Sequence, residues 1–317
     1  MNSRKLILAS GAAAALLTAC SFSSSSDPVS VSHYAVPQAA GVRHQTSSQQ
    51  TLIYTSHYDD TSGVIYAYPG GTQQTYEIDP ATGPEGLCSD SKGDVFLVGR
   101  SGEVEEYSFG ATSPTAAVSI AQEIADDGCA VDGTAEHIAM ITRTKRNTQV
   151  AVLTNFTPPV KSYSPTITPV SLTYDNKGNL FVLPIGKFLI EIKKGSRTFT
   201  TIPYGNSLSF SDASFIQWDG QYLAIIAVHG GRKEGFSHWI YRCKIAASAV
   251  QLVSIVKPLS FLDPRGAGRV RSWIQSDRNI FVSGQVSTGL SIWAYSDAGK
   301  KLAHFAGNFT DAVVAAP

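Results

Sequence analysis

A pattern of two short apolar strands joined by an aspartate turn recurs along the chain, and this repeat constrains the fold most strongly. The sequence GLCSDSKGDVFLV, residues 86–98, matches SLTYDNKGNLFV, residues 171–182, almost position for position. Weaker copies begin at Gly128, Ser214 and Ser272. A catalytic motif occurs once, so a recurring pattern indicates architecture.

The aspartates that mark these turns recur at nearly regular spacing. The intervals are 42, 43, 44 and 58 residues, and the positions are Asp90, Asp132, Asp175, Asp219 and Asp277. A period of roughly 40–45 residues with several short strands is typical of a β-propeller blade. Alternating apolar residues continue after each turn in further short runs, which predicts a four-stranded antiparallel sheet for each repeat.

The two ends of the repeat region supply halves of one more blade. Residues 51–78 contain three strand-like runs without an innermost strand, and residues 310–317 resemble an innermost strand with nothing after it. Pairing these ends closes the ring and removes the open edges that a linear stack would leave. We therefore predict an all-β, six-bladed β-propeller over residues 51–317, closed by the C-terminal strand joining the first blade.

The composition suits an all-β protein and disfavours nucleic acid as a partner. Hydrophobic residues make up 43% of the chain, and 27 glycines allow frequent turns. Lys and Arg number 25 against 25 Asp and Glu, so the whole chain has no large field of one sign. We expect a monomer that does not bind nucleic acid.

Residues 1–19 have the pattern of a lipoprotein signal peptide. Arg4 and Lys5 precede an apolar run over residues 6–17, which is too short to span a bilayer comfortably. The sequence LTAC, ending at Cys20, resembles the bacterial lipoprotein box, in which the cysteine sulfur receives a diacylglyceryl group. An ordinary secretory signal followed by chance by a cysteine is the alternative.

Residues 20–50 are rich in Ser, Gln, Ala and Pro and lack sustained apolar periodicity, which predicts a flexible, lipid-anchored tether. We therefore expect a protein of the bacterial cell envelope, held outside the cytoplasm by its N-terminal lipid. In Gram-negative lipoproteins a residue such as Ser21 after the cysteine usually permits export to the outer membrane.

The repeat also carries a resemblance to a known group. The pattern Asp-x-x-Gly-Asn/Asp-Leu/Val-Phe at Asp90 and Asp175 resembles that of NHL-repeat and gluconolactonase-like propellers, over essentially the whole chain after Thr51. The runs GLCSD and GCAVD, with YPGG at 68–71, are similar to uncharacterised bacterial lipoprotein propellers of that group. The resemblance specifies blades and says little about chemistry, because one fold hosts many functions.

The positions just before the innermost strands hold candidate cation ligands. In blade order these residues are Asp311, Glu85, Asp127, Val170, Ala213 and Arg271. Three acids from adjacent blades at the mouth of the central channel could hold Ca²⁺, which prefers oxygen ligands. The alternative is that the acids cap turns or lie in solvent, and beyond this Ca²⁺ we expect no cofactor.

The loops between second and third strands share one face with the links between blades, opposite the Asp-x-x-Gly turns. They span residues 56–63, 142–148 and 229–238, with the link 257–271. We expect ligand binding on this face. His229 and His238 stand at the ends of one loop, where a hairpin could bring them together for acid–base chemistry. The glycines between them are equally typical of a hairpin with solvated charges.

The cysteines leave one pairing open. Cys88 and Cys129 lie on innermost strands of adjacent blades, two and three residues before their turn aspartates. In one register their side chains would face different ways, so either a disulfide or two buried thiols fits the sequence. Cys243 is expected to be a packed, unpaired thiol. The sequence contains no Cys-x-x-Cys motif and no His cluster that would indicate a zinc site.

These features favour a binding or scaffold module that engages an unknown protein, glycan or small-molecule ligand through its loop face. The alternative is a metal-dependent lactonase- or lyase-like enzyme with its site at the channel mouth. Two departures from those enzymes disfavour it: the Trp-Phe-Thr-Glu-type strand of streptogramin lyase is absent, and the acids at 85, 127 and 311 do not reproduce the gluconolactonase-like set. An envelope protein without a discrete ligand site is a third alternative.

Overall fold

The computed structural model describes most of the chain from Thr51 to Ala315. The described residues are 51–57, 62–69, 73–78, 83–144, 147–205, 208, 213–231, 235–246, 248–259, 271–275, 279–285, 289–295, 300–305 and 309–315. The chain divides into two units, Met1–Val31 and Ser32–Pro317, and every described residue belongs to the second. The predicted signal peptide, Cys20 and the tether therefore lie outside the described residues.

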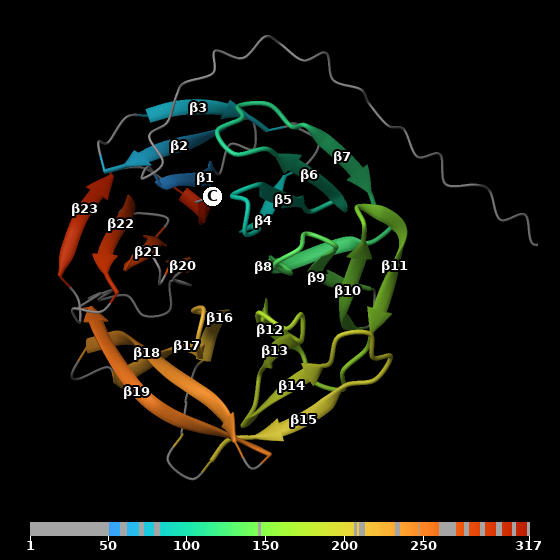
Figure 1. Cartoon of the computed structure of the whole chain (residues 1–317), viewed down its shortest axis with the longest axis vertical. Coiled ribbons are helices and arrows are strands. Elements are labelled where there is room, and N and C mark those ends of the chain that lie inside the picture. The colour runs from blue at the N-terminus through green and yellow to red at the C-terminus, as the bar shows by residue number, and fades with distance from the viewer. Residues whose placement is uncertain are drawn as a thin grey trace, which may run out of the picture. The chain divides into compact units, whose positions relative to one another are not determined.

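The described secondary structure consists of β-strands in six four-stranded antiparallel sheets, arranged around a common centre (Figure 1). From the innermost strand outward, the first sheet contains β24 (Phe309–Ala315), β1 (Thr51–His57), β2 (Ser62–Tyr68) and β3 (Gln73–Glu77). The second contains β4 (Pro84–Ser89), β5 (Val95–Gly99), β6 (Glu103–Tyr107) and β7 (Ala116–Ser119). The third contains β8 (Glu123–Val131), β9 (His137–Arg143), β10 (Thr148–Thr154) and β11 (Thr157–Tyr163).

The other three sheets follow in chain order with the same arrangement. The fourth contains β12 (Pro169–Tyr174), β13 (Leu180–Pro184), β14 (Phe188–Ile192) and β15 (Thr200–Pro203). The fifth contains β16 (Ala213–Trp218), β17 (Leu223–Gly231), β18 (Gly235–Ala246) and β19 (Ala249–Leu259). The sixth contains β20 (Arg271–Gln275), β21 (Ile280–Gln285), β22 (Gly289–Ala294) and β23 (Lys301–Phe305).

The C-terminal strand completes the first sheet. Strand β24 pairs with β1, with Leu52 opposite Ala315 and Tyr54 opposite Val313. Residues from the two ends of the described chain thus form one sheet, beside β4 of the second (Figure 1). The all-β propeller predicted from the repeat is confirmed, and so is its closure by the C-terminal strand.

The aspartate turns have the structural role that their recurrence indicated. The Oδ1 atom of Asp90 accepts hydrogen bonds of 2.9 Å from the backbone N–H groups of Lys92 and Asp94. Asp175 binds the N–H groups two and four residues ahead in the same way. Gly93 has a φ of 83°, the left-handed conformation that glycine adopts without steric cost. Each such turn reverses the chain from an innermost strand into the second.

The core lies between neighbouring sheets. Between the first and second sheets, Tyr54, Tyr76 and Tyr107 pack edge to face, with ring centroids 5.4 and 5.3 Å apart. Burial raises the pKa of Tyr54 well above its ordinary value, so its hydroxyl stays protonated. That hydroxyl accepts a 2.8 Å hydrogen bond from the N–H of Gly110. The aromatic side chains here fill the space between sheets.

Side-chain hydrogen bonds also join the innermost strands to one another. The side-chain amide of Gln217 on β16 donates to the carbonyl of Ile274 on β20 at 2.7 Å and accepts from its N–H at 2.6 Å. Between β4 and β24, the Ser89 hydroxyl donates to the carbonyl of Val314 at 2.7 Å. These bonds replace the backbone ladder that separate sheets cannot form.

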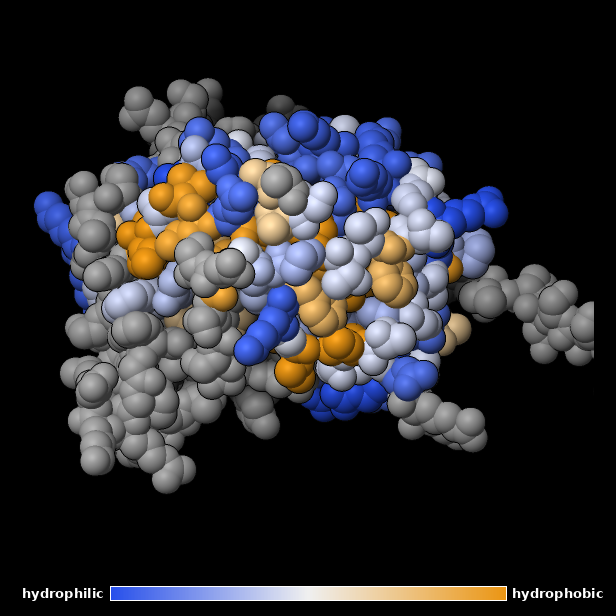
Figure 2. Space-filling model, turned by 90° about the horizontal axis from the view of Figure 1, so that it is seen from below, coloured by the Kyte–Doolittle hydropathy of each residue, from blue (hydrophilic) through white to orange (hydrophobic). Residues whose placement is uncertain are grey.

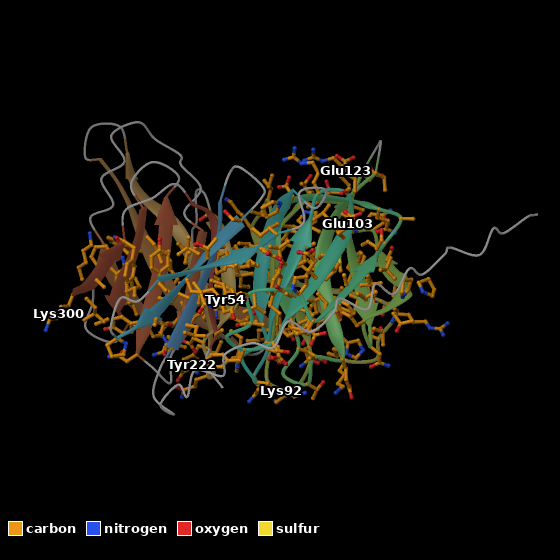
Figure 3. The ribbon with its side chains drawn as sticks, turned by 90° about the horizontal axis from the view of Figure 1, so that it is seen from above. Tyr54, Lys92, Glu103, Glu123, Tyr222 and Lys300 are labelled. Atoms are coloured by element: carbon orange, nitrogen blue, oxygen red, sulfur yellow. A yellow bond between two sulfur atoms is a disulfide. The ribbon has the colours of Figure 1, made fainter. Side chains whose placement is uncertain are left out.

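The ring has two distinct faces, which we call the turn face and the loop face. The turn face carries the aspartate turns between innermost and second strands; Lys92 and Tyr222 mark it at the bottom of Figure 3. The loop face carries the loops between second and third strands and the links between sheets; Glu103 and Glu123 mark it at the top. Within the described ranges, no helix is long and apolar enough to cross a membrane.

Candidate functional site

A polar recess of about 270 Å³ opens on the loop face, where the third sheet leads into the fourth. One wall is the β9–β10 loop and the other is the link from β11 to β12. The lining residues are Arg143, Thr144, Asn147, Thr148, Pro165, Thr166, Ile167 and Thr168. Four of these residues belong to the 142–148 loop, which the sequence predicted to lie on the binding face.

Hydrogen bonds fix the backbone of both walls. The N–H of Thr144 donates to the carbonyl of Asn147 at 2.8 Å, and the N–H of Asn147 donates to the Thr144 hydroxyl at 3.1 Å. In the other wall, the carbonyl of Thr168 accepts a 3.0 Å bond from the N–H of Ile185. These bonds hold Thr144 and Asn147 together across the β9–β10 loop and tie Thr168 to Ile185 of the fourth sheet.

The chemistry of the recess is that of a binding site. Arg143 supplies a guanidinium group, which stays charged at all physiological pH values and matches carboxylate or phosphate oxygens in a bidentate geometry. The threonine hydroxyls and the Asn147 amide donate and accept hydrogen bonds. The described lining residues include no His, Cys, Asp or Glu, the groups that most often carry nucleophilic or acid–base chemistry.

The three predicted channel-mouth acids lie within the innermost strands and not just before them, and Glu85 is already engaged. Glu85 is 5% exposed, and the Nε of Arg100 donates to its Oε1 at 2.5 Å. An ion pair at this position neutralises one of the three predicted Ca²⁺ ligands. The side chains of Asp127 on β8 and Asp311 on β24 lie outside the described residues, so the cation site stays a prediction.

The innermost strands carry the other residues of that predicted set as well. Val170 and Ala213 are part of β12 and β16, and Arg271 begins β20. The side chain of Arg271 lies outside the described residues. All six positions thus fall inside the innermost strands and not just before them, and a role of Arg271 in ligand binding stays a prediction.

The two loop histidines occupy adjoining positions of one hairpin. Strands β17 and β18 pair with His229 opposite Ser237 and Val228 opposite His238. The hairpin thus brings the backbone of the two positions together, as the sequence predicted. Their side chains lie outside the described residues, so their acid–base role stays a hypothesis.

Cys88 on β4 and Cys129 on β8 form a disulfide, with their Cα atoms 5.5 Å apart. Of the two arrangements that the sequence left open, the structure has the cross-link between neighbouring sheets. Cys243 is buried and unpaired within the described part of the chain, as expected. Burial raises the pKa of its thiol to about 12, so it is an inert packing residue.

The sequence reading missed a three-residue cluster on the turn face. Ligand atoms of Asp132, Glu136 and His137 lie within 4.8 Å of one another. Burial opposes ionisation of Asp132, but hydrogen bonds from the His137 side chain and backbone and from Thr134 outweigh it and lower its pKa. The His137 Nδ1 atom lies 2.9 Å from the carboxylate. The Asp132 carboxylate is therefore occupied in closing the turn. The sequence feature that could have indicated this cluster is the run DGTAEH, residues 132–137.

Comparisons with known proteins define the fold. No protein-family model and no curated protein matches the chain. A chain of the nidogen/laminin complex has 12% identity and a TM-score of 0.58, over 84% of this chain and 98% of that one. TolB from Acinetobacter baumannii has 11% identity and a TM-score of 0.57, over 84% of this chain and 66% of that one, about two-thirds of its length. At these identities the likeness shows the β-propeller fold alone.

Proposed function

We propose that the protein is an extracytoplasmic binding module that holds a polar ligand in the recess on its loop face. The observation that carries this proposal is the set of guanidinium, amide and hydroxyl groups around about 270 Å³ of space. Small-molecule pockets span roughly 300–1,000 Å³, so this recess suits one sugar-sized group or the end of a longer chain. Arg143, the one cation among the described lining residues, favours a ligand that carries a carboxylate among hydroxyls.

The same proposal includes the blade number and the family type. Six four-stranded sheets and the pairing of β24 with β1 support a six-bladed ring. The bonding shared by the turns at Asp90 and Asp175 supports the NHL-like character of the repeat. Neither feature identifies the ligand, whose binding we place on the loop face.

The location outside the cytoplasm has independent support. The disulfide between Cys88 and Cys129 fits an oxidising compartment, because thiols are kept reduced in the cytosol. The LTAC sequence before Ser21 supports acylation of Cys20. Labelling of growing cells with a radioactive fatty acid tests this anchor: we expect label in the parent chain and none in Cys20→Ser.

Ligand binding is tested on an array of acidic and neutral glycans with the Ser32–Pro317 unit, which contains the whole described fold. We expect capture of carboxylate-bearing sugars, and Arg143→Ala should weaken it about 10- to 100-fold, as for the loss of a charge-assisted hydrogen bond of 1.5–3 kcal/mol. Lys300→Ala is the control, because this exposed cation lies between β22 and β23 on the opposite face. Equal binding by the two variants would refute the recess as the site.

A further inference from the structure

Five exposed cationic side chains gather on the turn face around the fourth sheet. Three of them lie in the short turn between β14 and β15, one in the aspartate turn between β12 and β13, and one on β11 of the third sheet. We call this set the basic patch; its members are Lys161, Lys177, Lys193, Lys194 and Arg197. The turn face forms the upper edge of Figure 2, where hydrophilic side chains crowd together.

Specific contacts hold these segments side by side. The Nζ atom of Lys161 donates to the carbonyl of Ser196 at 2.6 Å, which joins β11 to the β14–β15 turn. The N–H of Lys194 donates to the Asn179 side chain at 3.1 Å, which joins that turn to the aspartate turn. The Lys194 stem also covers Gly178, where an added Cβ would lie 3.0 Å from its Cδ atom. The basic patch is therefore built from three segments in contact.

The cations of the basic patch outnumber the carboxylates of the same three segments. Across the described residues, none of its five members takes part in an ion pair. Asp175 is the one carboxylate in β11, the β12–β13 turn and the β14–β15 turn, and it accepts hydrogen bonds from neutral groups, the N–H groups of Lys177 and Asn179 and the Asn179 amide. The three segments therefore carry five cations against one carboxylate. A chain of zero net charge thus concentrates positive charge on one side of the turn face.

The chain enters the propeller on this same face. Strand β1 is a second strand, so it starts at the turn face and runs toward the loop face. Its register places Leu52 opposite Ala315, where the innermost strand β24 ends. The 31 residues from Cys20 to Gln50 therefore join the fold on the side of the basic patch. A flexible chain of that length has a root-mean-square reach of about 30 Å, comparable to a small domain.

We propose that the basic patch docks the propeller onto the phosphate groups of anionic lipids in the membrane that carries its acyl anchor. This rests on the proposed lipid tether, and it makes the turn face the membrane side and the loop face the ligand side. Each Lys or Arg near an anionic surface strengthens binding about fivefold. Asp94 and Glu106 lie on the turn face of the second sheet, so the domain tilts with the fourth sheet toward the lipid.

The test uses the Ser32–Pro317 unit, which lacks Cys20 and hence any acyl group. We expect it to float with vesicles containing phosphatidylglycerol at low salt, to be released at high salt, and not to bind vesicles of phosphatidylcholine alone. The double variant Lys193→Gln/Lys194→Gln should bind about 25-fold more weakly, with an unchanged melting temperature. Lys187→Gln, in the β13–β14 loop on the loop face, is the control and should bind as the parent does.

Three outcomes would overturn the proposal. The first is no binding to phosphatidylglycerol vesicles at low salt, and the second is an equal loss of vesicle binding in Lys187→Gln. The third is release of the vesicle-bound protein by soluble polyglutamate as readily as by competing anionic vesicles, which would indicate an acidic protein partner. Failure of the anchor is distinguishable, because it appears as loss of fatty-acid label at Cys20 while the Ser32–Pro317 unit still binds vesicles. Failure of the recess appears only in the glycan assay.

Discussion

Gly86 on β4 and Gly128 on β8 bring the innermost strands of two neighbouring sheets into direct backbone contact. A Cβ atom added to Gly86 would lie 2.6 Å from the Cα of Gly128 and 3.2 Å from the backbone nitrogen of Cys129. The contact lies within two residues of the disulfide on each strand. The two glycines therefore permit the approach that the cross-link between Cys88 and Cys129 requires.

Replacing Gly86 with alanine should destabilise the fold, because the backbone of β8 must move to make room for the methyl group. Overpacking of this kind costs about 1–3 kcal/mol, which urea unfolding measures. Gly133→Ala is the control: a Cβ there meets nothing within 4 Å, and no positive φ is involved. A larger loss of stability in Gly133→Ala than in Gly86→Ala would contradict the role given to the close contact at Gly86.

Removing the disulfide should cost more. The bridge spans 41 residues of sequence, and a loop of that length corresponds to about 4 kcal/mol of chain entropy in the unfolded state. We expect the variant Cys88→Ala/Cys129→Ala to lose stability on this scale in urea. A reducing agent should lower the stability of the parent toward that of the variant and leave the stability of the variant unchanged. If the reductant also destabilises the variant, its effect on the parent does not come from the Cys88–Cys129 disulfide.

The thiol of Cys243 should be unreactive in the folded protein. Burial raises its pKa to about 12, so the reactive thiolate is scarce at neutral pH, and access is closed as well. In the Ser32–Pro317 unit with its disulfide intact, Cys243 is the one remaining thiol of the chain's four cysteines. We expect maleimide labelling only on unfolding in urea, and rapid labelling without denaturant would contradict the burial.

The Asp132–His137 contact should make stability depend on acid. The pKa of Asp132 is lowered in the fold, so its contribution is complete above its ordinary value of 3.8 and is lost as the pH falls through the lower folded value. His137→Ala should cost about 1.5–3 kcal/mol near neutral pH, as for a hydrogen bond to a charged group. The difference from the parent should shrink in stronger acid.

The matched control for that experiment is Glu136→Gln, which changes the exposed neighbour and keeps the imidazole. Its urea midpoint should follow the parent across the whole pH range. A penalty in His137→Ala that is the same on both sides of 3.8 would show that the imidazole acts by packing and not through the Asp132 carboxylate.

The repeat predicted the sheets because its signals are local. An aspartate such as Asp175 binds N–H groups two and four residues ahead, and Gly178 supplies the left-handed conformation within the same turn. Such short-range chemistry is readable in the sequence wherever it recurs. The closing strand was also predictable, because an innermost strand was missing at one end and left over at the other.

The disulfide could not be settled by counting from the turns. Cys88 stands two residues before Asp90 and Cys129 three residues before Asp132, so the two side chains leave opposite faces of their own sheets. Both line the core between the second and third sheets, whereas Leu87 faces the first sheet and Ala130 the fourth. The one-residue offset is therefore what lets the two sulfur atoms meet. This relationship depends on how neighbouring sheets pack face to face and not on the register of either strand alone.

The Glu85–Arg100 ion pair and the basic patch could not be predicted for a different reason, because each forms between segments that are separated in sequence. Glu85 was read as a cation ligand, and no local signal indicates that Arg100 returns to pair with it. The basic patch was hidden because charge was counted over the whole chain, where the sum is zero. It forms only when Lys161 meets the turn at Ser196, 35 residues away. The ion pair and the basic patch therefore form only when folding brings these residues together.

The pairing of β24 with β1 has a consequence for biosynthesis. Strand β1 is among the first parts of the fold to be translated, yet its inner edge finds its partner only when Phe309–Ala315 has been made. Folding of the ring therefore finishes after synthesis, and long-range pairings of this kind form slowly. A chain that ends before β24 would leave the inner edge of β1 unpaired, and an unpaired strand edge can pair with another chain.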